Sequence, residues 1–350
     1  MSAPPRTVCH VNLARGFRGG ERQTQLLIEQ LAERGLEQTL VCRDDSPLRQ
    51  ALAGVQALTM VRANRMWQGH RQTPPAELVH AHEARAVHWA WWHARATGTP
   101  YLLTRRVPQP VRNKAFNRLT YRGAAQAVAI SSPIEAHLDA RGWCPVSRIP
   151  SALAGFSSRE TAVETLRRRF AGYRVVGHIG ALVDRHKGQR LIIEAARRLR
   201  KRHPELLFVL LGEGKDAEQF KAESADLDNL IWEGFQAHPG DYLAVMDLFI
   251  FPSRHEGLGS TLLDVMYAGV PVIASRVDGI PDIVDDDRSG VLIAPNDAGA
   301  LTEAIAALSA DPARADRLAD TARQQLAGYT PEAMAQAYLA LYRRLLEKAR

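Results

Sequence analysis

Short apolar runs alternate with longer amphipathic stretches along the chain, and this pattern predicts strands and helices in alternation. In the first half, a helix is expected at about 21–34, after the first apolar run. Six strands are expected there, near residues 7–12, 38–42, 58–61, 77–81, 101–104 and 127–130. Strands that alternate with helices are typical of a parallel sheet with helices on both faces.

The same pattern returns in the second half of the chain. Six further strands are expected near residues 175–179, 206–211, 230–232, 248–251, 270–274 and 291–293. The helices around them include 162–170, 189–202, 260–268 and 298–310. We therefore predict an α/β protein with two parallel-sheet domains, at about 1–168 and 169–330, and a last helix at 331–350.

Composition and length agree with a globular protein of two domains. The chain has 350 residues, of which 46% are hydrophobic and 24% charged. No apolar run reaches the roughly 18 residues that a membrane span needs, and the N-terminus shows no secretory signal. Cys9, Cys42 and Cys144 lack the spacing of a zinc site, so we expect reduced thiols and a cytoplasmic protein.

Basic residues are concentrated in the first half. Residues 1–172 hold 24 Lys and Arg against 12 Asp and Glu, whereas residues 173–350 hold 21 against 26. This asymmetry indicates that the two halves have different partners. The densest basic stretch contains no acid and comprises Arg105, Arg106, Arg112, Lys114, Arg118 and Arg122.

Two interpretations of this basic stretch remain open. It is either a solvated surface or a surface for an anionic membrane leaflet or a phosphorylated acceptor. No nucleic-acid-binding motif accompanies the charge, so we do not expect nucleic acid as a partner.

The segment HEGLGSTLLDVMYAGVPVIAS, residues 255–275, carries the most information. Its loop follows the predicted strand 248–251, and open α/β sheets bind ligands at the carboxyl ends of their strands. Gly257 and Gly259 let a ligand approach the backbone. We expect Ser260 to cap the following helix, whose first turn presents free N–H groups to an anion such as a phosphate.

Two carboxylates flank this turn. Glu256 precedes it, and Asp264 lies eight residues further on. Carboxylates repel phosphate, so these two are more suited to accept hydrogen bonds from sugar hydroxyls. The turn therefore predicts a site for a sugar that is attached to a phosphate.

This segment resembles the signature of the retaining GT-B glycosyltransferases, glycosyltransferase family 4 in particular. The resemblance covers nearly the whole chain and is strongest at 175–295. It implies a GT-B fold, in which two Rossmann-like domains face each other across a cleft. The acceptor domain would be 1–168, with the helix 331–350 packed back on it, and the donor domain would be 169–330.

The resemblance also implies roles for individual residues. Glu256 would contact the donor sugar, and the backbone of Gly257, Leu258 and Gly259 would contact the diphosphate. Asp264 would contact the ribose, although this position is usually Glu in the family and Asp is shorter by one methylene.

A second loop, HIGALVDRHKG at 178–188, follows the predicted strand 175–179. Gly180 frees its turn, and Arg185 and Lys187 bring positive charge to the edge where a leaving diphosphate would need it. The Lys-Gly pair matches the family, but Ala181 replaces the usual arginine, so Arg185 is a candidate for the missing charge. A basic surface loop is the alternative interpretation.

Two features of the first half match the same family. Gly19 and Gly20 precede the first long helix. They resemble the N-terminal glycine loop of the family, which borders the donor phosphate and the acceptor. His80 and His82 share one face of a strand end, and the resemblance implies that His82 places a sugar hydroxyl or backbone near the reacting centre. Two such histidines could also bind a metal or be satisfied within the core, but no third ligand is evident nearby.

We therefore predict a retaining, metal-independent glycosyltransferase that uses no cofactor besides its nucleoside-diphosphate sugar. His82, Glu256, Lys187 and Arg185 are the candidates for catalysis. The acceptor would be a hydroxyl of a glycan or glycolipid, such as an anionic lipopolysaccharide core at the inner membrane face. The alternatives are a GT-B epimerase that acts on the nucleotide sugar and a non-catalytic protein that only binds it.

Overall fold

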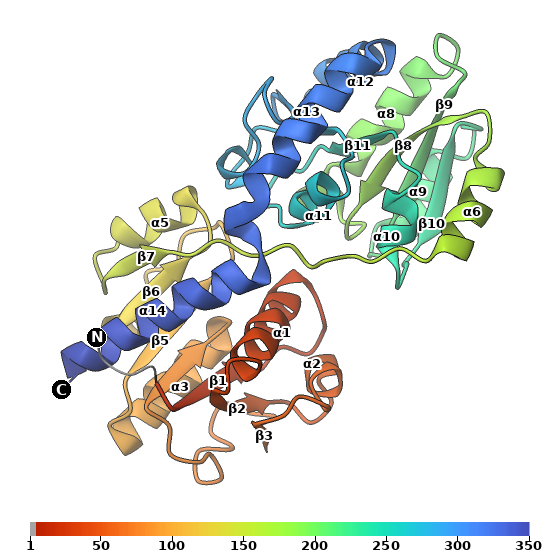
Figure 1. Cartoon of the computed structure of the whole chain (residues 1–350). Helices are drawn as coiled ribbons and strands as arrows, with labels where there is room; N and C mark the ends of the chain where they lie inside the picture. Colours follow the sequence, from red (N-terminus) through yellow and green to blue (C-terminus); the bar gives the residue numbers. More distant parts are fainter. Residues whose placement is uncertain (1–4, 350) are drawn as a thin grey trace. The chain divides into compact units, whose positions relative to one another are not determined.

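The computed structural model describes residues 5–349 and divides into two compact units. Unit 1 combines Met1–Ala154 with Gly328–Arg350, and unit 2 is Gly155–Ala327 (Figure 1). The chain therefore leaves unit 1 once and returns to it at its end. Residue 350 of the predicted last helix lies outside the described residues.

Unit 1 is built on a sheet of seven parallel strands in the order β3-β2-β1-β4-β5-β6-β7. The strands are β1 (Thr7–Asn12), β2 (Glu37–Cys42), β3 (Leu58–Arg62), β4 (Leu78–Ala81), β5 (Tyr101–Arg105), β6 (Gln126–Ala129) and β7 (Val146–Arg148). The helices are α1 (Gly19–Ala32), α2 (Pro47–Ala51), α3 (Ala84–Thr97), α4 (Ala115–Arg122), α5 (Ser132–Asp139) and α14 (Pro331–Ala349). The sequence pattern did not indicate the short edge strand β7.

The central strands are buried along nearly their whole length, because helices cover the sheet. Local signals set where those helices begin and end. The carboxylate of Glu83 accepts hydrogen bonds from the backbone N–H groups of Arg85 and Ala86, at 2.6 and 2.7 Å, and so caps α3. Gly98 ends this helix in the left-handed conformation, at φ 79°.

The last helix, α14, packs beside α1 in unit 1 (Figure 1). Its apolar side chains, among them Met334, Leu341 and Leu345, join a core that includes Leu27 of α1 and Leu102 of β5. This helix therefore completes the hydrophobic cover of a sheet whose last strand ends 183 residues earlier, at Arg148 (331 − 148).

Unit 2 is built on six parallel strands in the order β10-β9-β8-β11-β12-β13. The strands are β8 (Arg174–Ile179), β9 (Leu206–Leu211), β10 (Leu230–Gly234), β11 (Leu248–Phe251), β12 (Val272–Ser275) and β13 (Val291–Ile293). The helices are α6 (Glu160–Arg169), α7 (Asp184–Lys187), α8 (Gln189–Leu199), α9 (Ala217–Glu223), α10 (Pro239–Leu243), α11 (Thr261–Tyr267), α12 (Ala298–Ala310) and α13 (Pro312–Gln324). The described residues also form two 3₁₀ helices: η1 (Ile280–Asp282) lies in unit 2, and η2 (Gln325–Tyr329) spans the point where the chain returns to unit 1.

Both sheets have the strand order 3-2-1-4-5-6 of the Rossmann fold, and unit 1 extends it by one strand. The predicted pair of parallel-sheet domains is confirmed. In each sheet the order reverses between the first and the fourth strand, and ligands bind beside such reversal points. The loops after β1 and β4, and those after β8 and β11, are therefore where a site is expected.

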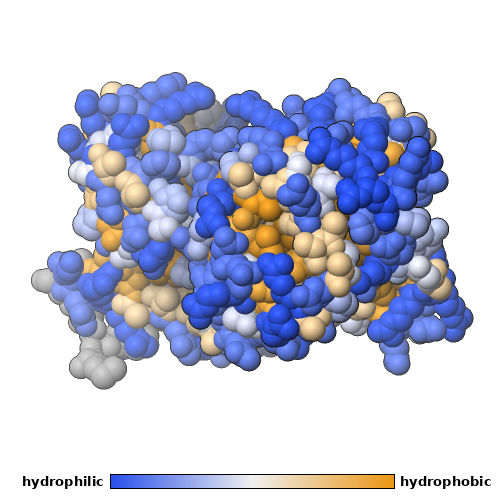
Figure 2. All heavy atoms as spheres, turned by 90° about the horizontal axis from the view of Figure 1, so that it is seen from above, coloured by the Kyte–Doolittle hydropathy of each residue, from blue (hydrophilic) through white to orange (hydrophobic). Residues whose placement is uncertain are grey.

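Hydrophilic residues cover most of the face seen in Figure 2, with hydrophobic patches between them. Among the helices of residues 5–349, none is both long enough and apolar enough to cross a membrane.

Candidate active site

The reversal point of unit 2 brings two loops together. Strands β8 and β11 pair directly, with Phe249 opposite Gly177, so the loops that follow them leave the sheet side by side. Gly188 makes their close approach feasible: its φ is +67°, and a Cβ there would lie 2.2 Å from the carbonyl oxygen of Pro252. The N–H of Arg254 then donates to the carbonyl of His186 at 2.8 Å, which ties the two loops to each other.

Lys187 and Glu256, both predicted from sequence, form an ion pair at this edge. Their side chains are 20% and 12% exposed, so both charges are largely shielded from water. Glu256 also accepts a hydrogen bond from the hydroxyl of Ser253 at 3.0 Å. The Lys187 ammonium lies 4.8 Å from the centre of the Phe251 ring, close enough for a cation–π contact.

A carboxylate in the loop after β12 holds the backbone of Glu256 in place. The Glu256 N–H donates to Asp278 Oδ2 at 2.9 Å, and His255 Nδ1 lies 3.6 Å from the same oxygen. The backbone at Asp278 has a φ of 42°, a conformation that non-glycine residues seldom adopt. Sequence reasoning missed Asp278, because it follows β12 and no motif marks it.

The loop after β8 is held by a second charged group, centred on the buried Asp184. This carboxylate accepts from the backbone N–H of Arg190 at 2.9 Å and pairs with the side chains of Arg190 and Arg254. Burial alone would raise the pKa of Asp184, but these hydrogen bonds and charges outweigh burial and lower it. Asp184 therefore stays ionised and fixes the short helix that presents Arg185 and Lys187.

Arg185 is exposed, whereas Gly180 is half-buried beside the side chains of His178 and Lys187. The Gly180 N–H donates to the carbonyl of Leu211 at 3.0 Å, so its turn is held against the end of β9. A Cβ on Gly212 would lie 1.9 Å from the Gly180 carbonyl oxygen, which explains glycine there. The structure thus gives Gly180 a close backbone contact, and it leaves Arg185 open to solvent.

The glycine turn after β11 differs in one detail from the prediction. Gly259 has a φ of 83°, but Ser260 has helical dihedral angles and makes no side-chain capping hydrogen bond. The expected serine cap is therefore wrong, because the helical geometry of Ser260 does not place its hydroxyl at the N–H groups of the first turn. Leu258 is buried, and Asp264 accepts a hydrogen bond from the Gly155 N–H at 2.8 Å.

His178, which the sequence analysis did not select, joins β8 to β11 below this site. Its Nδ1 donates to the Ile250 carbonyl at 2.9 Å. Burial lowers the pKa of His178 to about 4, so the imidazole is neutral at pH 7.

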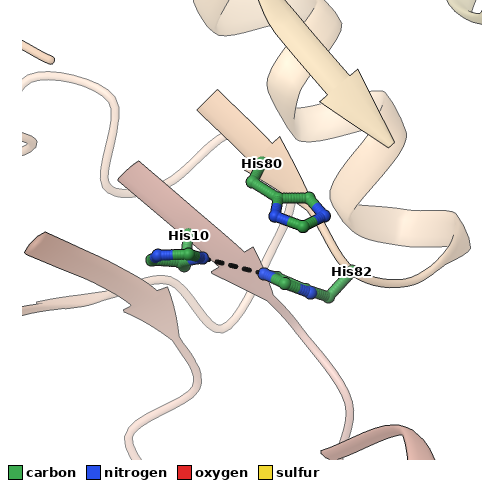
Figure 3. A group of neighbouring side chains, drawn as sticks. All are labelled: His10, His80 and His82. Atoms are coloured by element: carbon green, nitrogen blue, oxygen red, sulfur yellow. Dashed lines mark hydrogen bonds between the residues drawn. The ribbon is translucent and has the colours of Figure 1, made fainter. Parts of the chain in front are cut away.

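The reversal point of unit 1 holds three buried histidines, His10, His80 and His82 (Figure 3). His10 on β1 pairs with His80 on β4, and His82 follows β4 with the same side-chain parity as His80. Ring nitrogens of all three lie within 4.8 Å of one another. His10 is thus the third histidine that the sequence analysis did not find near His80 and His82.

Both ring nitrogens of His80 lie within hydrogen-bond distance of a hydroxyl group. Its Nδ1 lies 2.7 Å from the Tyr342 hydroxyl of α14, and its Nε2 lies 2.7 Å from Thr104 Oγ1. Thr104 Oγ1 also lies 2.9 Å from the Tyr338 hydroxyl. His80 therefore belongs to the contact between the sheet and α14, which leaves His82 nearer the open end of the strand.

Arg106 requires a correction, because it does not lie on the basic surface to which the sequence analysis assigned it. It follows β5 and shares side-chain parity with Thr104, so it turns towards the histidines. Its Nη1 donates to the His82 carbonyl at 2.9 Å, and burial lowers its pKa. Gly19 and Gly20 do not precede α1 as expected but are its first two residues, because the helix begins directly after Arg18. A Cβ on Gly20 would lie 3.7 Å from the Arg106 side chain, so the start of α1 borders this site.

The other basic residues agree better with a surface. Arg112, Lys114 and Arg118 are exposed on and before α4, while Arg105 is half-buried and donates to the Gln109 carbonyl at 2.6 Å. Leu119 is 48% exposed on the same helix. The segment therefore presents both positive charge and apolar surface to its surroundings.

Comparisons with known families agree with these features. The family model for glycosyl transferases group 1 matches residues 167–325, and the model for a glycosyl transferase 4-like domain matches residues 18–150. Two Rossmann-like sheets and these family matches define an enzyme of the GT-B fold that transfers sugars. The chain belongs to the group 1 glycosyltransferases.

Individual relatives are similar over nearly their whole length. The chain is 28% identical to lipopolysaccharide core biosynthesis glycosyltransferase LpsE of Rhizobium meliloti (strain 1021), over 92% of this chain and 95% of LpsE. It is 27% identical to LpsD of the same organism, a protein with the same description, over 97% and 99%. The fold matches the crystal structure of Anabaena Alr3699/HepE in complex with UDP at a TM-score of 0.83 and 17% identity, over 96% and 99% of the two chains.

Proposed function

We propose that the chain is a retaining glycosyltransferase that moves a sugar from a nucleoside diphosphate to a hydroxyl of an anionic glycan or glycolipid. The observation that carries this proposal is the shielded Lys187–Glu256 pair at the reversal point of unit 2. A cation there compensates the charge that grows on a departing diphosphate, and the carboxylate accepts hydrogen bonds from sugar hydroxyls.

In this proposal, unit 2 is the donor domain. The backbone of Gly180 and of the turn Gly257, Leu258 and Gly259 contacts the diphosphate, because a glycine puts no side chain between the ligand and the backbone. Asp264 contacts the ribose. Arg185 is exposed close to Lys187 along the chain and adds positive charge for the diphosphate.

Unit 1 is the acceptor domain in this proposal. Gly19, Gly20 and His82 lie at its own reversal point, and they contact sugar hydroxyls there. The exposed cations Arg112, Lys114 and Arg118 attract a phosphorylated acceptor or an anionic leaflet. Their place on and before one short helix favours a surface that acts as a unit.

The reaction breaks the bond between the sugar C1 and the diphosphate oxygen and forms a bond between C1 and the acceptor oxygen on the same face. The acceptor proton passes to the departing phosphate oxygen. The protein supplies orientation and charge stabilisation, and we propose that neither a metal ion nor another cofactor takes part.

Two full-length relatives are named for lipopolysaccharide core biosynthesis, which supports a core oligosaccharide as the acceptor. The HepE structure holds UDP, which supports a nucleoside diphosphate as the leaving group. Together with the exposed cations Arg112, Lys114 and Arg118, these similarities favour a protein that acts at the cytoplasmic face of an inner membrane on a phosphorylated acceptor.

The test is a transfer assay with a panel of UDP-, GDP- and ADP-sugars and a truncated lipopolysaccharide core. Nuclear magnetic resonance (NMR) of the product should show the anomeric configuration of the donor. An inverted product, an epimerised nucleotide sugar, or binding without turnover would each overturn the proposal in a different way. Glu256→Gln should abolish most transfer, whereas Glu218→Gln, at an exposed carboxylate on α9, should not change it.

A further inference from the structure

We propose that His10 and Gln38 are positioning residues that fix the tautomer of His82, so that its Nδ1 is an unprotonated acceptor for a sugar hydroxyl. The inference rests on the proposed function for the identity of the ligand. The tautomer itself follows from hydrogen bonds within unit 1. It assigns a role to two buried polar residues on β1 and β2 that the transfer mechanism leaves unused.

The chain of hydrogen bonds begins at a backbone carbonyl, which can only accept. The carbonyl of Ile28 in α1 lies 2.9 Å from Gln38 Nε2, so the amide nitrogen of Gln38 must face it. The amide oxygen of Gln38 then points the other way, to His10 Nε2 at 3.0 Å. Because an amide oxygen only accepts, the proton of His10 must sit on Nε2.

The next link is the second nitrogen of His10. His10 is fully buried, and its burial lowers its pKa to about 4, so the ring is neutral and carries one proton. Since Nε2 holds that proton, Nδ1 offers a lone pair. His82 Nε2 lies 2.9 Å from this Nδ1, and it must therefore donate (Figure 3).

His82 is left with a lone pair on Nδ1. Burial lowers its pKa well below the usual value, and His80, His10 and Arg106 lower it further, so His82 is also neutral. Its Nδ1 is buried and has no hydrogen-bond partner among residues 5–349. A buried acceptor without a donor is destabilising and is rare in folded proteins, so its presence here suggests a function.

Arg106 supplies the complementary group. Its Nη1 is bound to the His82 carbonyl, and its Nε–H is buried and unpartnered within the described part of the chain. An unused acceptor and an unused donor on two residues in contact match a group that can both donate and accept, and a sugar hydroxyl is such a group. Both atoms are closed to solvent without ligand, so a sugar reaches them only after a local opening of this edge.

The tautomer can be read directly, without substrate. Long-range ¹H–¹⁵N correlation spectra of the full chain, labelled with ¹⁵N-histidine, should show His10 and His82 both protonated at Nε2 at pH 7.5. Spectra of His10→Asn and His82→Asn assign the two signals. A His82 ring protonated at Nδ1, or at both nitrogens, would overturn the proposal.

Gln38→Leu tests the positioning role, because it removes the acceptor that orients His10. We expect His82 to populate the Nδ1-protonated tautomer in this variant. KM should be measured for both the donor and the acceptor. For the substrate whose hydroxyl binds His82, KM should rise about three- to tenfold, the effect of one weakened hydrogen bond, with kcat nearly unchanged. Gln126→Leu is the matched control, since Gln126 is also buried in this sheet but donates to Ser147 at 2.9 Å.

Equal spectra and equal KM values in the Gln38→Leu and Gln126→Leu proteins would also overturn the proposal. So would one zinc ion per chain that is lost in His10→Leu, because a metal would occupy the lone pairs used here. Failure of the wild type to transfer any sugar would instead contradict the proposed function. The tautomer spectra would still decide the roles of His10 and Gln38 in that case.

Discussion

The ammonium of Lys187 forms an ion pair with the carboxylate of Glu256, although 69 residues separate them in the chain. The pair exists because β8 and β11 are neighbours and Gly188 lets the loops beyond them touch. Its two charges are largely shielded from water, so neither is an ordinary surface group. Removing one partner would leave the other largely shielded from water without its opposite charge.

Lys187→Ala should lower turnover by about 10²–10³-fold, the scale of losing one group that stabilises charge in a transition state. Sugar transfer should be measured at saturating donor, with Lys221→Ala as control, because Lys221 is an exposed lysine on α9 of the same unit. Turnover within a few-fold of wild type would remove Lys187 from the diphosphate site.

The fold could be predicted because buried parallel strands read as continuous apolar runs, and the central strands of both sheets are of this kind. Lys187 and Glu256 could be found for the same reason, since each follows the end of such a run. The edge strand β7, only half-buried, gave no comparable signal.

The histidine cluster could not be predicted, because it depends on strand register. His10 lies opposite His80 only after β1 and β4 pair, and the Tyr342 that binds His80 comes from 262 residues further on. Arg106 was misplaced because the basic stretch was treated as one surface. Side chains two residues apart along a strand point to the same face, so the position of Arg106 relative to Thr104 could have predicted that it turns towards the histidines.

Gly188→Ala should destabilise unit 2 and weaken donor binding, because its Cβ would clash with Pro252 in addition to straining the backbone. Strain alone costs about 1–3 kcal/mol at such a position. Gly172→Ala is the matched control: its φ is also positive, at 87°, but no atom lies within 4 Å of the added Cβ. Calorimetry should therefore show a clearly larger loss for Gly188→Ala, and equal losses would mean that the loop contact is not tight.

Unit 1 should lose stability as pH falls from about 6.5 towards 4. Burial lowers the pKa of His10 and His93 to about 4 and those of His80 and His82 well below the usual value. The unfolded chain takes up protons near pH 6.5, whereas the folded unit does not, so stability is complete above that pH and falls below it. For His10 and His93, whose pKa values are about 4, the loss is about 2 kcal/mol each by pH 5.

Urea unfolding followed by tryptophan fluorescence measures this, because five of the six tryptophans lie in unit 1. His93→Gln should reduce the stability lost between pH 7 and pH 5 by the contribution of one histidine. His137→Gln, at an exposed position, should leave this loss unchanged. A transition midpoint that is the same at pH 7 and pH 5 would contradict the prediction.

Sugar transfer should survive excess EDTA, because Lys187 and Arg185 supply the positive charge that a metal ion would otherwise bring to the diphosphate. Nucleotide release should be compared with and without chelator, and then after addition of Mg²⁺ or Mn²⁺. Activity that disappears with EDTA and returns with the metal would show that the two cations are insufficient.

The exposed cations Arg112, Lys114 and Arg118 should draw the protein to anionic membranes. Each cation near a charged surface contributes about 1 kcal/mol, and salt screens the attraction beyond about 10 Å at 0.1 M. Leu119 adds apolar contact from the same helix. In liposome sedimentation, changing all three cations to Ser should therefore lower binding to anionic vesicles, and the difference should shrink as salt is added.

The control replaces three exposed cations of unit 2 with Ser, namely Lys201, Arg202 and Lys215. It removes the same net charge, so it separates a local surface from the effect of overall charge. The unit 2 variant should sediment like wild type with anionic vesicles, and all three proteins should bind neutral vesicles equally weakly. If the two triple variants lose the same fraction of bound protein, the segment around α4 acts only through net charge and is not a membrane surface.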